Sequence, residues 1–299
     1  MHISVFDSER PLRFSAKTSE RIRFLLCFVP PFSYALIFMI LPYFNILQFS
    51  FWRADRYTVI PDLNLDNYGV VWNNSLYSYV ILNSFWIASL VTVSSALAGY
   101  CLAYFVAFTA RKNKNLLYLL IILPLWTSFL LRAYIWKIIL GREGIINGAL
   151  MYFGVVDEPI SIFIYNNFSI TLALTYVFIP FVALPVFTAL ERIPRQYVEA
   201  SMDLGANGLK TFWRIILPLS LPGLIAGCIF TFCLSFGDFV TPTLLGGADG
   251  IMIANVIIGQ FGAAFNWPLG SALAVVVIVV VLAVVGLGSK LEKRVPKVA

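Results

Sequence analysis

Few residues of this sequence could do chemistry by themselves. The chain holds four cysteines, all inside apolar runs, and a single histidine, His2. No two cysteines have the C-x-x-C spacing, and no histidine accompanies them, so neither a metal site nor a redox pair is indicated. We expect the cysteines to be small buried hydrophobic residues; they are Cys27, Cys101, Cys228 and Cys233. The sequence predicts no metal site and no catalytic residue.

One stretch has the residue types of a phosphate-binding loop. GANGLKT, residues 205–211, contains glycine, lysine and threonine but not the spacing G-x-x-x-x-G-K-[ST], which occurs nowhere in the chain. No histidine, cysteine or paired-carboxylate constellation could serve as acid and base. We therefore expect a protein that is not an enzyme, binds no cofactor and does not hydrolyse ATP alone.

The composition is that of a membrane protein. Of the 299 residues, 60% are hydrophobic and 12% charged, and the mean hydropathy is +0.86. Soluble chains have about half apolar and a quarter charged residues, so too few charges are present to cover a water-exposed surface. A soluble enzyme and a disordered chain are excluded. The net charge of +6 comes without a basic stripe interleaved with aromatics, which excludes a nucleic-acid binder.

Charge-free runs predict six membrane helices, since one crossing needs about 20 apolar residues. We place them near 24–51, 80–108, 116–138, 168–190, 217–238 and 267–288. The polar residues of 67–79 predict an external loop before the second helix. Residues 251–264 are too short to cross and predict a helix at the interface. A cytoplasmic segment 1–23, a membrane domain 24–288 and a cytoplasmic tail 289–299 follow, with no internal repeat.

Lysine and arginine set the predicted orientation. Sixteen of them fall on the side of the two termini and five on the other. By the positive-inside rule both termini are cytoplasmic. The loop between the fourth and fifth helices then lies in the cytoplasm.

That loop, residues 191–218, has the sequence ERIPRQYVEASMDLGANGLKTFWRIILP. Charged and apolar residues recur at helical spacing. Pro194 suits the first turn of a helix, Gly205 permits a positive φ, and Asn207 can cap a following helix. The pattern predicts two short helices joined at a glycine. An amphipathic loop lying along lipid headgroups would show the same periodicity.

The loop also contains a longer motif. Its order is Glu199, Ala200, Ser201, three residues, Gly205, nine residues, Ile215, one residue, Leu217 and Pro218. This order resembles the EAA loop of bacterial ABC importer permeases, EAA-x3-G-x9-I-x-LP, with Ser201 where the family usually has alanine. The resemblance implies an all-α membrane protein with the type I importer permease fold, six transmembrane helices and a cytoplasmic coupling helix in this loop.

The resemblance further implies that separate subunits hydrolyse ATP, complete the pore and deliver the substrate. A cytoplasmic dimer of ATP-binding subunits would hold ATP and Mg²⁺ and receive the loop in a groove. Glu199 would pair with a basic residue of that groove, Ala200 and Ser201 would allow close approach, and Gly205 would set the turn. A second, related permease would complete the pore as a heterodimer. A periplasmic solute-binding protein would deliver the substrate.

Other segments resemble the spermidine/putrescine ABC-transporter permeases. They are LPLWTSFLLRAYIWKIILGREGIIN (123–147), the loop itself, and GDFVTPTLLGGADGIMIANVI (237–257) followed by Trp267 and Pro268. This resemblance implies a bacterial inner-membrane importer for a small cationic substrate, a polyamine.

One acid and two bases bear on such a substrate. Asp238 follows 23 charge-free residues and lies between Phe236 and Phe239. Charge pairing and cation–π attraction make these three residues candidates for the substrate path, although Asp238 also suits an ordinary helix terminus. Arg132 and Lys137 would repel a cation. We expect them to reach the external headgroups or to position this end for a binding protein.

The sequence as a whole predicts the permease subunit of an ATP-driven, binding-protein-dependent polyamine importer that works by alternating access. Another small solute is an alternative cargo: an organic cation, an amino-acid derivative or a metal ion. An ion-coupled carrier or channel is an alternative of another class. Such proteins usually need membrane-embedded acids or broken helices in paired halves, whereas here only Asp238 is found, without a repeat.

Overall fold

The computed structural model describes residues 16–55, 58–109 and 113–294. Most of the predicted cytoplasmic segment 1–23, with His2, lies outside the described residues, as does the end of the predicted tail 289–299. The chain divides into two compact units, Met1–Gln48 and Phe49–Ala299, and each is described by itself.

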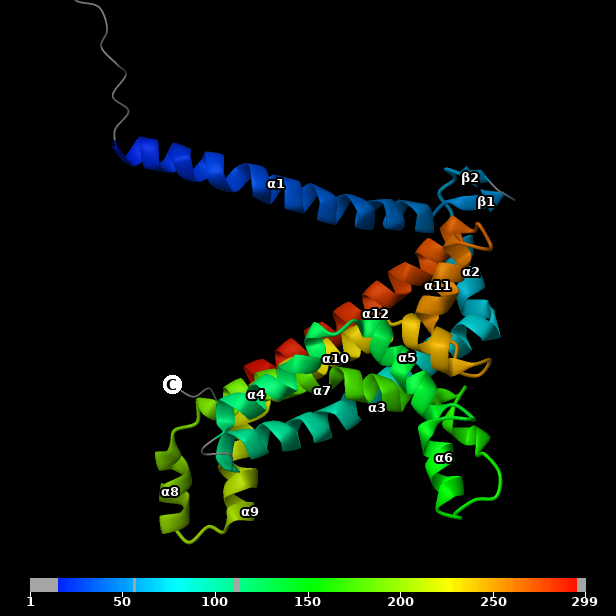
Figure 1. Cartoon of the computed structure of the whole chain (residues 1–299). Coiled ribbons are helices and arrows are strands. Elements are labelled where there is room, and N and C mark those ends of the chain that lie inside the picture. The colour runs from blue at the N-terminus through cyan, green and yellow to red at the C-terminus, as the bar shows by residue number, and fades with distance from the viewer. Residues whose placement is uncertain (1–15, 56–57, 110–112, 295–299) are drawn as a thin grey trace, which may run out of the picture. The chain divides into compact units, whose positions relative to one another are not determined.

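The first unit consists of α1, which runs from Ala16 to Ser50 and so ends two residues inside the second unit (Figure 1). Its apolar part begins at Arg23 and has 28 residues, about 42 Å at 1.5 Å per residue, which is enough to cross a bilayer. Almost every described side chain between Arg23 and Gln48 is exposed. The predicted first membrane helix is confirmed.

The second unit holds the remaining elements. In chain order they are β1 (Arg53–Asp55), β2 (Thr58–Ile60), α2 (Asp66–Asn73), α3 (Ser75–Tyr104), η1 (Phe105–Thr109), α4 (Lys114–Ile122), η2 (Leu123–Trp126), α5 (Phe129–Leu140), α6 (Ile145–Tyr152), η3 (Ser161–Phe163), α7 (Asn167–Glu191), α8 (Arg195–Asp203), α9 (Gly208–Thr211), η4 (Phe212–Ile216), α10 (Leu217–Phe236), η5 (Pro242–Gly246), α11 (Ile253–Phe261) and α12 (Trp267–Lys293). The elements η1, η4 and η5 are π-helical, and η2 and η3 are 3₁₀ turns. The strands form one antiparallel pair in which Ala54 faces Val59.

The core of the second unit is built from α3, α7 and α10. Small residues let these helices approach closely, as is common in membrane bundles. A Cβ on Gly99 of α3 would lie 3.0 Å from the Ile179 carbonyl of α7. A Cβ on Gly227 of α10 would lie 2.8 Å from the Cα of Val182, and one on Gly223 would collide with α7 as well. The spacing of Gly223 and Gly227 therefore reflects close helix packing.

The long helices match the predicted crossings except for the third. Within the described residues, five helices are long and apolar enough to cross a membrane. A sixth crossing exists only if the bent pair Lys114–Trp126 and Phe129–Tyr152 is one span, and its halves meet at 92°. The expectation of one helix over 116–138 is therefore wrong. Pro124 and the extended backbone of Thr127 (ψ 151°) interrupt the helical hydrogen bonds at this point.

Two further expectations need correction. The predicted loop 67–79 is largely helical, because α2 covers its first half and Asn74 then caps α3 by accepting a hydrogen bond from the Leu76 amide. None of the four cysteines is fully buried as expected: Cys27 and Cys101 are exposed, and Cys228 and Cys233 are half-buried. An apolar side chain that faces lipid or another subunit is exposed in a single chain, so membrane burial and burial within the chain differ.

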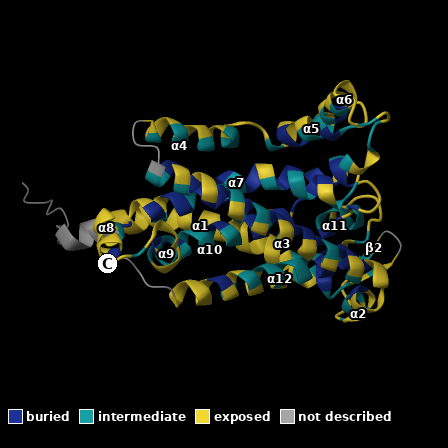
Figure 2. Ribbon diagram, turned by 90° about the horizontal axis from the view of Figure 1, so that it is seen from below, coloured by how far each residue is buried: buried dark blue, intermediate teal, exposed yellow. Residues whose placement is uncertain are grey.

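The functional elements gather at two ends of the second unit. In Figure 2, α8 and α9 lie at one end, and α2, α5, α6 and α11 lie at the other. The predicted short helix of 251–264 is confirmed as α11, which packs on α12 and buries Ile253 completely.

Candidate functional site

The loop between α7 and α10 folds as two short helices around a glycine. α8 ends at Asp203, Gly205 has φ +80°, and α9 begins at Gly208. The Asn207 side chain accepts a hydrogen bond from the Lys210 amide at 2.9 Å and so caps α9. Pro194 stands at the cap position just before α8. The predicted turn and cap are confirmed, and Pro194 lies one position earlier than expected.

A buried hydrogen bond ties the two helices of the loop together. The Ser201 and Thr211 hydroxyl oxygens lie 2.6 Å apart, and the two residues are 7% and 2% exposed. Ser201 is therefore largely covered within its own chain, and the close approach to a partner that the motif implied for it stays a prediction. Sequence reasoning missed Thr211, since nothing in the motif marks it as the partner of position 201.

The motif residues converge on one small apolar cavity. Ala200 and Ser201 of α8 face Ile215 of η4 and Pro218 of α10 across a hollow of about 380 Å³, which Leu204 also borders. Leu217, in contrast, packs into the core beside Ile216. The spacing of the motif thus brings α8 against the start of α10.

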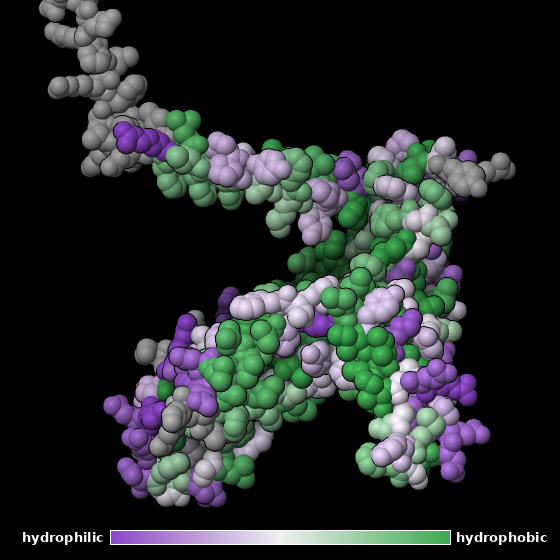
Figure 3. Space-filling model, in the orientation of Figure 1, coloured by the Kyte–Doolittle hydropathy of each residue, from purple (hydrophilic) through white to green (hydrophobic). Residues whose placement is uncertain are grey.

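Glu199 points to the other side of α8. It is exposed and borders a separate cavity of about 390 Å³ together with Arg195 and Lys114. There Lys114 Nζ lies 2.6 Å from Glu191 Oε1. Hydrophilic residues, in purple in Figure 3, gather at the end of the unit where α8 and α9 lie.

Large apolar side chains at the tip of the loop face outward. Leu204 is 89% exposed and Leu209 67%, and Trp213 follows at 60%. Exposed apolar groups gathered on one face mark an interaction site for another protein or a membrane. The sequence contains these residues, but only the structure shows that their side chains are exposed.

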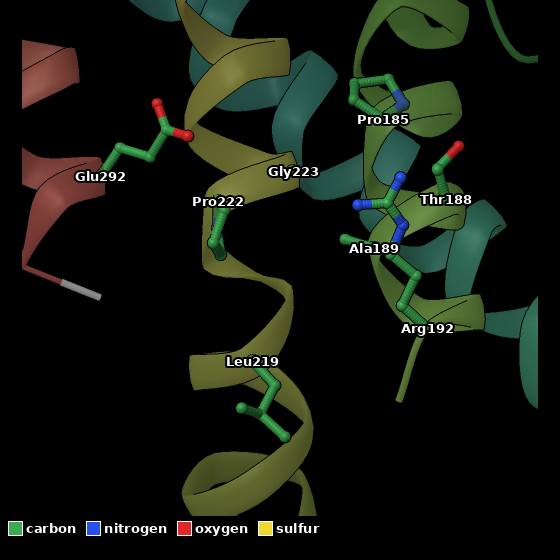
Figure 4. Close-up of a pocket in the computed structure, with 8 residues that line it drawn as sticks. All are labelled: Pro185, Thr188, Ala189, Arg192, Leu219, Pro222, Gly223 and Glu292. Atoms are coloured by element: carbon green, nitrogen blue, oxygen red, sulfur yellow. The ribbon is translucent and has the colours of Figure 1, made fainter. Parts of the chain in front are cut away.

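A larger cavity lies behind the loop. It has a volume of about 550 Å³ and is bordered by Pro185 and Ala189 of α7 and by Gly223 of α10. Arg192 and Glu292 lie on either side of α10 at this cavity (Figure 4). Beside this cavity the absence of a side chain on Gly223 lets α10 pack closely on α7.

Asp238 lies just beyond the end of α10 and is 7% exposed. Its two carboxylate oxygens accept hydrogen bonds from the amides of Val240 and Thr241, both at 3.1 Å. Burial raises the pKa of this carboxyl, while the backbone hydrogen bonds lower it. Phe236 is fully buried and Phe239 is 46% exposed. In this conformation Asp238 caps the following turn, and of the three predicted path residues Phe239 alone is open to the surface.

Arg132 differs from the expectation that it reaches the headgroups. It is only 8% exposed, and among the residues that the structure describes its Nε and Nη1 have no hydrogen-bond partner. Its guanidinium carbon lies 6.0 Å from the Phe129 ring centroid. The bend after Thr127 turns this face of α5 toward α7. Lys137, one and a half turns further on, is half-buried and borders a cavity beside η5.

The membrane helices and the loop define a transport permease. A model of the family described as "Binding-protein-dependent transport system inner membrane component" matches residues 95–296. The chain belongs to this family and is a multi-pass permease component of such a transport system.

Characterised relatives cover most of the chain. It is 36% identical over 246 residues to the spermidine/putrescine transport system permease protein PotB of Haemophilus influenzae, covering 82% of this chain and 85% of that one. It is 35% identical over 252 residues to the inner membrane ABC transporter permease protein YdcU of Escherichia coli, covering 79% of both.

A solved structure confirms the fold. A bacterial ABC transporter involved in the import of the acidic polysaccharide alginate aligns with a TM-score of 0.74, over 93% of this chain and 98% of that one. The sequences are 17% identical, so the similarity shows the fold alone. The predicted type I importer permease fold is confirmed.

Proposed function

We propose that this chain is the permease subunit of a polyamine importer and that it forms half of the translocation pore. The exposed apolar tip of the α8–α9 loop is the observation that supports an ATP-driven mechanism, because it offers a surface for a motor protein. The cargo rests on the 36% identity to PotB over most of both chains. Spermidine and putrescine are therefore the expected substrates.

A separate dimer of ATP-binding subunits supplies the energy. These subunits bind ATP and Mg²⁺, and their grooves receive Leu204, Leu209 and Trp213 of the loop. Glu199 is exposed on the same short helix, where it can pair with a base of the groove. Because Ser201 and Thr211 join the helices of the loop, closure of the motor displaces the loop as one body.

The displacement reaches the membrane through the helices on both sides of the loop. α7 enters it and α10 leaves it, and these helices pack against each other along Gly223 and Gly227. Alternating access follows if a second, related permease carries out the matching movement. Both termini and the loop are then cytoplasmic, as the distribution of lysine and arginine predicts.

A periplasmic solute-binding protein delivers the cargo at the opposite end. Phe239 is exposed there beside the buried Asp238, and a movement that opens the capped turn would present both to an ammonium group. We propose that this turn, with Phe236 behind it, borders the cargo path.

Reconstitution tests the proposal. The permease pair, ATP-binding subunits and binding protein are placed in vesicles, and uptake of labelled spermidine and putrescine is measured. Accumulation that requires both ATP and the binding protein is expected. Uptake without ATP would indicate an ion-coupled carrier. If neither polyamine accumulates, whereas another organic cation, an amino-acid derivative or a metal ion is taken up with ATP and its binding protein, the cargo is corrected.

A further inference from the structure

A cavity of about 390 Å³ opens beside η5. It is bordered by Lys137 of α5 and by Tyr165, just before α7. Thr243 of η5, Gly247 after it, and Asn255 of α11 also border it. These elements lie at the end of the second unit opposite the α8–α9 loop, where α5 and α11 are seen in Figure 2. The cavity is distinct from the two cavities that Ala200 and Glu199 border.

The walls of this cavity are held in an unusual conformation. Tyr165 has φ +63° and Gly247 has φ +61°, and they contact each other, since a Cβ on Gly247 would lie 2.8 Å from the Tyr165 Cβ. A positive φ is uncommon in a residue other than glycine, and such conformations cluster at functional sites. Asn255 Nδ2 donates hydrogen bonds to the Phe239 carbonyl at 2.9 Å and to Thr243 Oγ1 at 2.7 Å. The cavity is therefore preformed.

Lys137 contributes the one formal charge among the described residues that border the cavity. It is half-buried, and it makes no ion pair with any residue that the structure describes. Two acids flank the lining in sequence: Asp249 is exposed in the turn after Gly247, and Asp238 is buried and hydrogen-bonded to the amides of Val240 and Thr241. A half-buried ammonium group at the edge of a preformed hollow attracts an anion and repels a polyamine. The cavity is thus suited to a carboxylate and not to the cargo.

We propose that this cavity receives an acidic side chain of the solute-binding protein, with Lys137 as its ion-pair partner. The inference rests on the proposed function, in which such a protein docks at this end. A protein that binds a polycation presents carboxylates around its cleft, which complements Lys137. The Asn255 hydrogen bond to the Phe239 carbonyl links the cavity to the turn after α10. Docking here therefore places the open cleft beside the proposed cargo path.

Binding-protein titration tests this site. The assembled transporter is reconstituted in nanodiscs, and its ATPase rate is measured against the concentration of spermidine-loaded binding protein. Lys137→Glu is expected to raise the half-saturating concentration about tenfold and to flatten its dependence on salt, because a docking charge pair is reversed. Lys137→Gln should raise it about threefold, and Lys137→Arg should match the wild type. The maximal ATPase rate should stay unchanged.

Arg142→Glu is the matched control, since Arg142 is exposed, lies five residues away and does not border the cavity. This variant should behave as the wild type. Equal titrations for Lys137→Glu and Arg142→Glu would overturn the proposed site. An unchanged half-saturating concentration with an altered KM for spermidine uptake would show instead that the cavity binds cargo. If Lys137→Glu fails to assemble, Lys137→Gln decides between these outcomes.

The wild-type titration separates the two proposals. If the wild type is stimulated and every Lys137 variant matches it, the docking site is wrong and the importer function stands. If the wild type shows no stimulation, the binding-protein mechanism itself fails.

Discussion

A π-helical turn lies near each end of α10, yet the surroundings of the two turns differ: η4 leads directly into α10, and η5 follows it after residues 237–241. Beside η4, the loop tip exposes Leu204 and Leu209. Beside η5, Thr241 and Leu245 are buried, and Ser169 of α7 donates a hydrogen bond to the Leu245 carbonyl at 2.8 Å. One end presents apolar groups that its own chain leaves uncovered, whereas the other is fastened to the core.

The difference indicates what each end is for. A surface of uncovered apolar groups needs a partner protein, and its position depends on that partner. A segment fastened by hydrogen bonds keeps its geometry without one, as a docking platform or a cargo gate requires. The four variants below test whether the two ends differ in this way.

The largest expected effect is at Gly205. Gly205→Val places a β-branched residue at φ +80°, which costs about 1–2 kcal/mol and distorts the turn between α8 and α9. Spermidine uptake should be abolished while the subunit still inserts into the membrane. Gly208→Val is the control, because Gly208 lacks a positive φ and has open space around it. Normal uptake by Gly205→Val would remove the coupling role of the loop.

Leu204→Glu should come next. A central apolar side chain in an interface contributes about 2 kcal/mol or more, so the affinity for the ATP-binding subunit should fall at least about tenfold. The stability of the permease pair should not change, since Leu204 is 89% exposed. Leu63→Glu, at an 83% exposed site outside the loop, is the matched control. A binding isotherm with equal affinities for both variants would contradict the assigned interface.

Asp238→Asn tests the end of α10 beside η5. Asparagine caps helices about as well as aspartate, so assembly and thermal stability should be preserved. Loss of the charge should lower spermidine uptake about threefold, and putrescine uptake by less. Asp238→Ala removes the cap as well and should reduce stability by about 1 kcal/mol. An unchanged spermidine rate in Asp238→Asn would leave the cap as the sole role of this residue.

The smallest effect is expected at Ser201. Ser201→Ala removes a buried hydrogen bond and should lower stability by about 1 kcal/mol, with uptake retained. Thermal unfolding of Ser201→Ala, Thr211→Val and the double variant should show that the effects are not additive. Additive effects would mean that the two hydroxyl groups do not stabilise the loop as a pair.

Local signals predicted much of this structure. The turn at Gly205 and the cap at Asn207 follow from the conformations that single residues permit. Five of the six crossings follow from hydropathy. The break near Thr127 does not, because a charge-free run predicts a crossing whether or not its helix is continuous. The helical part of 67–79 was missed because Asn74, a polar residue typical of loops, also caps helices.

Burial was the harder prediction. The charge of Arg132 predicts contact with water, but the bend before α5 directs it into the protein. Leu204 has the hydropathy of a core residue and is nearly free of contacts. In both cases the position of a neighbouring element decides, and the sequence around the residue does not contain that information.

The glycine face of α10 has one more consequence. Gly223 and Gly227 bring the backbone of α10 so close to α7 that an added Cβ at either position would overlap with that helix. We expect a force applied to the loop between these helices to shift both together. The 20 residues of α10, about 30 Å long, would then carry the movement toward the far side of the membrane. In this view α7 and α10 move as one rigid body and do not bend.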